Sequence, residues 1–332
     1  MHAVLIGGAG FIGLNIAEAL LTRGHHVTVL DRVPIPAIAK LRFADLPGEL
    51  RTVVADVSDA ATLNEAFADG ADLVVLGAAI TADAARDARE PQAILAVNLL
   101  GIVPILQAAR AAKVRRVINL SSVAALGRSV FGPQSSGLLD ETVLGQPESL
   151  YAITKLATEQ VCARLAQLWP MDIVSVRLSA AFGPWERFGG LRDTVSPQLQ
   201  VMAALERQEP ASFAHPGFRD WVYSVDVAEA VITLAESEAL AHRLYHVSTP
   251  HRSSALAFAE AVAADHPGFD AALALPGHTA TIDIHAQADR LSLDVGRIKA
   301  ETGWQARFTP SLALDHYSAW WRQFGPDMLA TT

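Results

Sequence analysis

Up to residue 180, short apolar runs alternate along the chain with segments of helical spacing. Runs rich in valine, leucine and isoleucine predict strands at residues 3–7, 26–30, 51–55, 72–77, 115–121 and 172–179. The intervening segments repeat apolar residues at helical spacing and predict helices near 12–23, 59–68, 91–112 and 149–168. Apolar strands that alternate with helices are typical of a parallel sheet covered on both faces. The pattern therefore predicts an α/β fold built on a doubly wound parallel sheet.

The pattern changes after residue 178. Glycine and proline are frequent over 183–220, where one helical segment occurs. Apolar runs at 219–236 and 243–248 predict a return to the sheet, and the remaining residues mix short helices with short strands. We expect a larger domain of residues 1–178 plus 219–248. A smaller, discontinuous α/β lobe would then comprise residues 179–218 plus 249–332.

Composition and charge narrow the class of protein. Of the 332 residues, 51% are apolar and 18% are charged, a balance that supports a large buried core and excludes a disordered chain. The net charge of −9 argues against a nucleic-acid partner, because such proteins usually carry a basic face. The single cysteine, Cys162, cannot form an internal disulfide, which suits a reducing compartment.

The longest apolar stretch, residues 93–112, is interrupted by Asn98, Gly101, Pro104 and Gln107. These interruptions favour a buried or interface helix over a membrane span. The N-terminal residues run into the first strand without a charged leader and do not resemble a signal peptide. We therefore expect a cytoplasmic protein with no membrane partner.

A glycine-rich turn joins the first predicted strand to the first predicted helix. Gly7, Gly10 and Gly13 have the spacing that lets a chain turn, a pyrophosphate approach the backbone and a helix pack closely. Asp31 ends the next strand, where a carboxylate would bind ribose hydroxyls and repel a 2′-phosphate, favouring NAD over NADP. Neighbouring Arg32 would weaken that discrimination. The larger domain is thus predicted to be a dinucleotide-binding, Rossmann-type domain, although a tight strand–helix turn alone has the same spacing.

Other expected cofactor contacts follow the strand ends. The start of the first helix, the loop after the third strand and the small residues after the fourth strand all lie at the carboxyl edge of a parallel sheet. These residues are Phe11, Ile12, Asp56, Val57, Gly77, Ala78 and Ala79. Asp56 equally suits the start of a turn, and small residues after a strand are also ordinary turn formers.

Six short segments occur in a fixed order: GGAGFIG, SSVAALG, YAITK, VRLSAAFGP, RDWVYSVDVA and ETGW. Together they resemble the extended short-chain dehydrogenase/reductase family, the NAD-dependent epimerase/dehydratase group, over nearly the whole chain. The resemblance implies an enzyme with Tyr151 as general acid/base, Lys155 as its partner and Ser122 as the third catalytic residue. It also implies that Tyr151 and Lys155 contact the cofactor.

Elementary chemistry agrees with these roles. Lys155 lies one helical turn from Tyr151 on the same face, and a nearby cation favours the ionised form of a phenol. Ser122 ends the fifth predicted strand, where its hydroxyl would hold the substrate oxygen. Ser121 is the competing candidate, because adjacent strand residues point to opposite faces. The position of Gly127 in the family motif favours Ser122.

Two further polar residues belong to the predicted helices around this site. The family often has an asparagine at the position of Asn98 that supports the lysine through water and so belongs to the cofactor site. A solvent-facing or interface role suits Asn98 almost as well. Glu159, one turn beyond Lys155, is expected to be an ion-pairing surface residue.

The substrate contacts depend on the resemblance. Nucleotide-sugar relatives have a diphosphate-binding asparagine three residues before the glycine of the GP pair, where this chain has Ala180. Arg219 matches the family arginine that often meets a substrate phosphate. Arg187 and Arg192 would add positive charge in the lobe, or be solvated at its surface. Trp185 suits a sugar ring or the core of the lobe, and the same holds for Phe182.

We therefore expect NAD-dependent oxidation or epimerisation at a secondary alcohol of a small sugar or sugar acid. The alternative is a nucleotide-sugar 4-epimerase acting on a UDP- or dTDP-sugar, and a further alternative is a non-catalytic NAD sensor. Dehydratases of the family carry an Asp-Glu pair after the active serine or threonine. Val123 and Ala124 occupy those positions and cannot transfer protons, so a dehydratase is not expected.

Metal binding and self-association complete the expectations. No HExxH or CxxC motif occurs, and His242 and His246 are separated by a loop-to-strand segment, so no metal is expected. The predicted helices at 91–112 and 149–168 are apolar for surface helices. In the family these two helices form a four-helix interface between subunits, which predicts a homodimer with a two-fold axis.

Overall fold

The computed structural model describes residues 1–332 except 58–59, 132–136, 190–191, 286–287 and 331–332. Its centre is a parallel sheet of seven strands in the order β11-β6-β5-β4-β1-β2-β3. The strand order reverses between β1 and β4, so the predicted doubly wound α/β fold is confirmed. The strands are β1 (His2–Ile6), β2 (His26–Asp31), β3 (Glu49–Val54), β4 (Leu73–Leu76), β5 (Arg116–Ser122), β6 (Asp172–Leu178) and β11 (Leu244–Val247).

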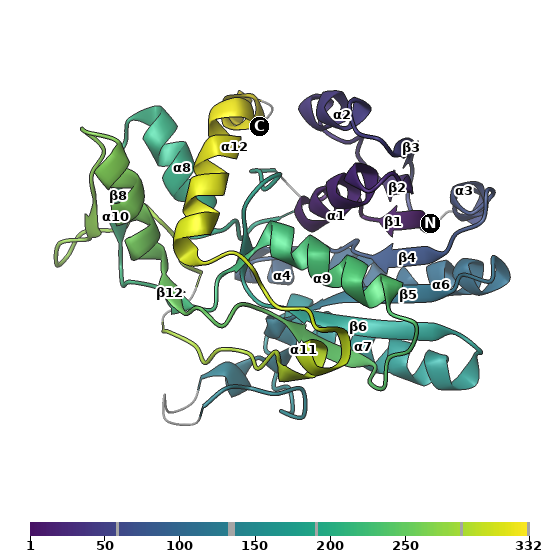
Figure 1. Cartoon of the computed structure of the whole chain (residues 1–332). Helices are drawn as coiled ribbons and strands as arrows, with labels where there is room; N and C mark the ends of the chain where they lie inside the picture. Colours follow the sequence, from purple (N-terminus) through teal and green to yellow (C-terminus); the bar gives the residue numbers. More distant parts are fainter. Residues whose placement is uncertain (58–59, 132–136, 190–191, 286–287, 331–332) are drawn as a thin grey trace.

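Alternation along the strands divides the apolar core between the two faces of the sheet. In β1, Ala3 and Leu5 belong to one cluster, whereas Val4 and Ile6 belong to the other. The first cluster includes α1 (Phe11–Thr22) and α9 (Ser224–Glu236), which lie side by side in front of the sheet in Figure 1. The second includes α6 (Ile102–Ala111) and α7 (Leu150–Leu168).

The predicted helix at 91–112 is interrupted by a change of helical type. It consists of α5 (Pro91–Leu95), a π-helical turn at Ala96–Leu100 that contains Asn98, and α6. The sequence pattern did not predict α2 (Ala37–Ala44), because eight residues are too few for a clear helical period. The shorter helical segments are α3 (Ala60–Ala66), α4 (Ala84–Arg89), two 3₁₀ turns at Val123–Leu126 and Arg128–Val130, and α11 (Gly296–Thr302).

Helices α8 (Pro197–Arg207), α10 (Ala255–Asp265) and α12 (Pro310–Ala330) gather at one end of the molecule in Figure 1. Three two-stranded sheets accompany them, in which β10 pairs with β7, β12 with β9 and β13 with β8. The segment 243–248 returns to the main sheet as β11, whereas 219–236 contributes α9 and short strands outside that sheet. The short strands are β7 (Ala181–Phe182), β8 (Ala211–Phe213), β9 (Phe218–Arg219), β10 (Val222–Tyr223), β12 (Ser253–Ser254) and β13 (Ala271–Leu273).

Candidate active site

The glycine turn joins β1 to α1 and requires glycine at two positions. Gly7 has φ +75°, and a Cβ there would lie 2.5 Å from the Cα of Ala78, so only glycine fits. A Cβ on Gly13 would lie 2.6 Å from the Cα of Gly8, which explains the close packing of α1 on the turn. Gly10 is the N-cap of α1 and has no side chain to occupy the N–H groups of the first turn. These groups remain available to an anion.

Asp31 lies at the end of β2 beside this turn. Its Oδ2 accepts a hydrogen bond from the backbone N–H of Ala9 at 3.0 Å, and its Oδ1 accepts one from Val33 at 3.3 Å. Burial raises the pKa of the Asp31 carboxyl, and the backbone N–H donors oppose that shift. The carboxylate is therefore fixed at the edge of the cavity, where the sequence predicted a ribose contact.

Arg187 is not where the sequence analysis expected it. Its guanidinium donates to the carbonyl oxygen of Ala9 at 2.7 Å, so it lies at the glycine turn and not among the substrate residues. Burial lowers the pKa of Arg187, and the charge of Asp31 opposes that shift. Arg187 thus binds the backbone carbonyl of Ala9 and Asp31 binds its N–H, and together they fix the loop between β1 and α1.

We predict that Asp31→Ala narrows the preference for NAD over NADP. Loss of the carboxylate removes charge-assisted hydrogen bonds, typically about 1.5–3 kcal/mol for a charged group, and removes repulsion of a 2′-phosphate. Calorimetric titration of both cofactors measures the ratio. Asp45→Ala, at the exposed end of α2, is the control and should change neither affinity. Equal affinities in the unmodified protein would contradict the role of Asp31.

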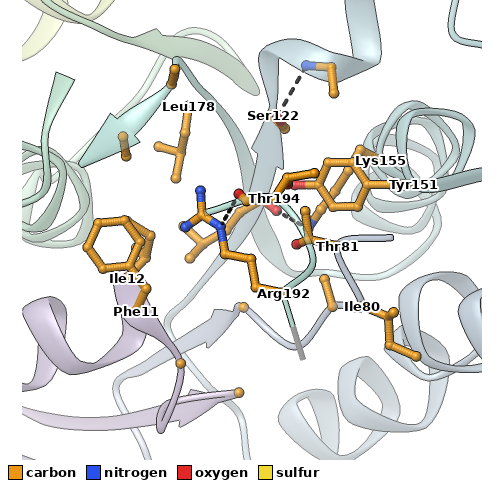
Figure 2. A pocket seen from close by; sticks show the side chains of 18 of the residues that line it. Phe11, Ile12, Ile80, Thr81, Ser122, Tyr151, Lys155, Leu178, Arg192 and Thr194 are labelled. Carbon is orange, nitrogen blue, oxygen red and sulfur yellow. Dashed lines mark hydrogen bonds between the residues drawn. The ribbon is translucent and has the colours of Figure 1, made fainter. Parts of the chain in front are cut away.

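Tyr151, Lys155 and Ser122 line one cavity of about 510 Å³ together with the glycine turn and Asp31. The Nζ of Lys155 donates to the carbonyl oxygen of Leu120 at 2.7 Å and lies 5.7 Å from the centre of the Tyr151 ring. Lys155 is only 7% exposed, so its charge acts within the cavity wall. Figure 2 shows the phenol and the ammonium group side by side.

The structure distinguishes Ser122 from Ser121. The hydroxyl of Ser121 donates to Glu159 at 2.5 Å and is buried. The Oγ of Ser122 accepts a hydrogen bond from the N–H of Ala124 at 3.2 Å, which leaves its proton available to a substrate oxygen. This geometry supports Ser122 as the substrate-facing serine.

Glu159 was expected at the surface, but its side chain is buried. It is 7% exposed and accepts two hydrogen bonds from Arg177 on β6, at 2.9 and 2.7 Å. The expectation of a surface ion pair is wrong, because α7 turns this side chain toward β5 and β6. The buried pair connects α7, which carries Tyr151, to β6, and the hydrogen bond from Ser121 connects Glu159 to β5, the strand that ends at Ser122.

Asn98 does not line the cavity, contrary to its expected place in the cofactor site. Its Oδ1 accepts from the N–H of Ile80 at 2.7 Å, and its Nδ2 donates to the carbonyl of Ile80 at 3.0 Å and to Thr154 at 3.3 Å. The amide therefore fixes the loop after β4 against α7. That loop continues into Thr81, which does line the cavity.

Two further arginines, Arg219 and Arg290, line the same cavity. Arg219, which the sequence predicted, donates to the carbonyl of Ile284 at 2.9 Å, and Arg290 donates to Ser179 at 2.8 Å and to Asp220 at 3.4 Å. Burial, together with the charge of Arg290, lowers the pKa of Arg219 to about 10. Two partly desolvated guanidiniums favour an anion between or beside them.

Arg192 is a third cation in the cavity wall. Its backbone pairs with Thr81, and its guanidinium lies 5.3 Å from the centre of the Phe11 ring and donates to the carbonyl of Thr194 at 2.9 Å. Figure 2 shows its side chain in the cavity, with the guanidinium beside Thr194. A salt bridge to the buried Glu186 at 3.3 Å holds it.

The two aromatic candidates belong to the core. Trp185 is fully buried, donates from its indole to Glu18 at 2.7 Å and packs edge-on against Trp320. Phe182 is 4% exposed and packs on Tyr223. Neither lines the cavity, so of the two alternatives, a sugar contact or the core of the lobe, the structure favours the core. Both rings belong to the larger of the two core clusters that cover the sheet.

The remaining predicted residues do line the cavity. They are Phe11, Ile12, Arg32, Asp56, Val57, Gly77, Ala78, Ala79 and Ala180. The sequence analysis missed several wall residues: Thr81, Thr194, Trp221, His285 and Arg290. Two of them carried a usable signal: Thr81 follows the fourth strand closely, and Trp221 lies in the RDWVYSVDVA segment. Among the described residues, no cluster of three or more His, Cys, Asp or Glu side chains could hold a metal ion.

Comparison with known proteins gives a consistent result. The family model described as "NAD dependent epimerase/dehydratase family" matches residues 3–247. The UDP-glucose 4-epimerase of Mycolicibacterium smegmatis is 28% identical over 70% of this chain and 72% of its own. The dTDP-glucose 4,6-dehydratase of the same organism is 25% identical over 97% of this chain and 96% of its own. The solved structure of MoeE5 in complex with UDP-glucuronic acid and NAD has a TM-score of 0.76 at 23% identity, covering 97% of this chain and 99% of that chain.

Proposed function

This chain belongs to the NAD-dependent epimerase/dehydratase family of extended short-chain dehydrogenase/reductase enzymes, and from that premise we propose that it oxidises or epimerises a secondary alcohol of a sugar or sugar acid. The observation that carries the proposal is the meeting of Tyr151, Lys155 and Ser122 with the glycine turn in one cavity. A protein that only sensed NAD would have no use for a positioned acid–base pair, which weighs against the sensor alternative.

The residues around the glycine turn fit NAD. The uncapped start of α1 offers N–H groups to a pyrophosphate, Gly7 and Gly10 leave room for it, and the fixed carboxylate of Asp31 suits a ribose. Bound NAD would accept the hydride that leaves the alcohol carbon. Asp56 and Arg32 also line this cavity and would flank the adenosine end.

The chain's own groups manage the proton. Ser122 would hold the substrate hydroxyl, and the Tyr151 oxygen would take its proton as the carbon is oxidised. The Nζ of Lys155, which donates to the carbonyl oxygen of Leu120, lies 5.7 Å from the centre of the Tyr151 ring and so stands beside the group that would move the proton. For epimerisation Tyr151 would return the proton after the opposite face of the carbonyl is reduced. Val123 and Ala124 line the cavity without a proton-transfer group, which weighs against dehydration.

The charges in the wall support an anionic substrate. Arg219, Arg290 and Arg192 all line the cavity that contains Tyr151. A sugar acid would place its carboxylate at one of these guanidiniums. Ala180 weighs against a diphosphate, because an alanine side chain cannot donate a hydrogen bond there.

A nucleotide-sugar 4-epimerase is the second candidate function. The curated relative named UDP-glucose 4-epimerase and the MoeE5 complex favour it. Arg290 favours it too, since two arginines together would bind a diphosphate better than Arg219 alone.

A substrate panel tests the proposal. Sugars, sugar acids, and UDP- and dTDP-sugars are incubated with the protein and NAD, and NADH formation and product stereochemistry are followed. We expect NADH or an epimer from a sugar acid, and calorimetry should show that sugar acids bind. If a UDP- or dTDP-sugar binds with micromolar affinity while sugar acids do not bind, the proposed sugar-acid activity is wrong and the nucleotide-sugar 4-epimerase replaces it. If no compound is converted, the result favours the non-catalytic NAD sensor.

We also predict a homodimer. The helical segment Pro91–Ala111 is long and apolar enough to cross a membrane, but a buried or interface helix passes the same test. Exposed apolar side chains gather on this segment and on α7, among them Leu100 at 66%, Ile153 at 42% and Leu168 at 56%. Self-association would cover them. Light scattering at micromolar concentration measures the mass. A monomer would refute the dimer, and Leu100→Glu should weaken it, whereas Leu41→Glu on α2 should not.

A further inference from the structure

Helix α7 packs a stripe of polar side chains against the sheet. Its buried members are Thr154, Lys155, Thr158 and Glu159. Lys155 and Glu159 are four residues apart on one helical face, which is the spacing of an intrahelical ion pair. In this structure the two groups bind different partners. The Nζ of Lys155 donates to the carbonyl oxygen of Leu120 on β5, whereas Glu159 pairs with Arg177 on β6.

The guanidinium of Arg177 occupies both oxygens of the Glu159 carboxylate. Its Nε donates to Oε1 at 2.9 Å and its Nη2 donates to Oε2 at 2.7 Å. The hydroxyl of Ser121 donates to Oε1 as well. A bidentate, charge-assisted pair of this kind is among the stronger interactions available to a carboxylate. The ammonium of Lys155 is thus left to its carbonyl partner in the wall of the cavity.

The charged groups of this network share one dry region of the interior. Arg177, Lys155 and Glu159 are all buried. Burial raises the pKa of the nearby Cys162 thiol to about 12, and the charge of Glu159 adds to that shift while the charge of Lys155 opposes it. In such surroundings the attraction between opposite charges is much stronger than in water. An unpaired Glu159 carboxylate would therefore attract the ammonium one turn away.

The neighbour of Arg177 on the adjoining strand β11 is His246, which does not share its charge. The two residues are paired in register across the strands. Burial, together with the charge of Arg177, lowers the pKa of His246 to about 3, so its ring is uncharged near neutral pH. With Arg177 removed, Lys155 is the cation one turn from Glu159 on the same face of α7.

We propose that Arg177 is a positioning residue for the reaction. Its guanidinium occupies the Glu159 carboxylate and so prevents that carboxylate from drawing the Lys155 ammonium along the helix. The ammonium therefore stays at the carbonyl of Leu120, beside Tyr151. The importance of that place for turnover rests on the proposed function. The partner that Lys155 chooses is a property of the fold and is measured separately.

Crystal structures of three full-length variants with NAD bound test which partner Lys155 chooses. Arg177→Met leaves the carboxylate unpaired, and we expect the Nζ of Lys155 to move from Leu120 to Glu159. Glu159→Gln breaks the same ion pair but leaves no carboxylate, so the ammonium should stay at Leu120. It should also stay in the double variant Arg177→Met with Glu159→Leu, because the competing group is absent. Crystals are grown at about pH 8, where an ordinary histidine such as a released His246 is uncharged.

Turnover separates a positioning role from general damage to the fold. It is measured on the compound converted in the substrate panel, per folded protein as counted by NAD binding. Arg177→Met should be about 10- to 100-fold slower than Glu159→Gln, since a small misplacement of a catalytic group has effects of that order. The double variant should recover most of the loss, which a merely structural ion pair would not allow. Arg116→Met removes another buried arginine, at the opposite end of β5 from Ser122, and should keep normal turnover.

The proposal is overturned if the Nζ of Lys155 remains at Leu120 in Arg177→Met, or if Glu159→Gln displaces it equally. Equal turnover in Arg177→Met and Glu159→Gln overturns the positioning role as well. Should Arg177→Met fail to fold, Arg177→Gln replaces it with the same expected movement, because its amide still donates a hydrogen bond to the carboxylate but brings no charge. If the panel yields no converted compound, the crystal structures alone decide.

Discussion

Tyr151→Phe is expected to lower turnover by about 10²–10⁴ while the affinity for NAD stays nearly the same. The substitution removes only the phenolic oxygen, the atom that would carry the substrate proton. The ring remains, so its contact with Lys155 at 5.7 Å and the packing of α7 remain as well. Single-turnover kinetics on the true substrate measure the chemical step, and calorimetry measures NAD binding.

Tyr245→Phe is the matched control for this experiment. Tyr245 lies on β11 outside the cavity, and its hydroxyl donates to Glu301 at 2.5 Å. We expect turnover to be unchanged in that variant. A Tyr151→Phe enzyme with normal turnover would show that another group moves the proton, and the assignment of Tyr151 would be wrong.

The largest expected effect on stability comes from Glu159→Gln. This change leaves Arg177, which is 4% exposed, as a buried charge without its carboxylate. Breaking a buried ion pair from one side typically costs about 3–5 kcal/mol of unfolding free energy. The effect should appear in a denaturation midpoint measured with NAD absent.

Two comparisons separate the pair from general damage. Glu148→Gln removes an exposed carboxylate paired with Arg128 and should leave the denaturation midpoint nearly unchanged, because water and salt screen an exposed pair. The double variant Glu159→Leu with Arg177→Met removes both charges and should be more stable than Glu159→Gln, because no uncompensated charge remains. A Glu159→Gln protein as stable as the unmodified one would mean that Arg177 finds another partner.

Local sequence determined much of this protein. Strand positions followed from apolar runs, since a strand buried on both faces admits few polar residues. The glycine turn followed from Gly7, whose positive φ excludes other residues, and its neighbours along the chain. Tyr151 and Lys155 meet because helical periodicity alone places residues four apart on one face. Each of these features depends on contacts between near neighbours in sequence.

Only the tertiary structure decided the surroundings of the site. Arg187 holds the glycine turn, Trp185 enters the core and Arg290 joins Arg219, although no local pattern distinguishes these fates. Arginine and tryptophan combine long apolar parts with a polar end, so their sequence positions are compatible with surface, core or cavity. Glu159 shows the same limit. A glutamate in a helical pattern is normally predicted to be exposed, and the sequence does not show that Arg177 on β6 is its buried partner. Long-range packing of the lobe against the sheet, and not the local sequence, selects among these environments.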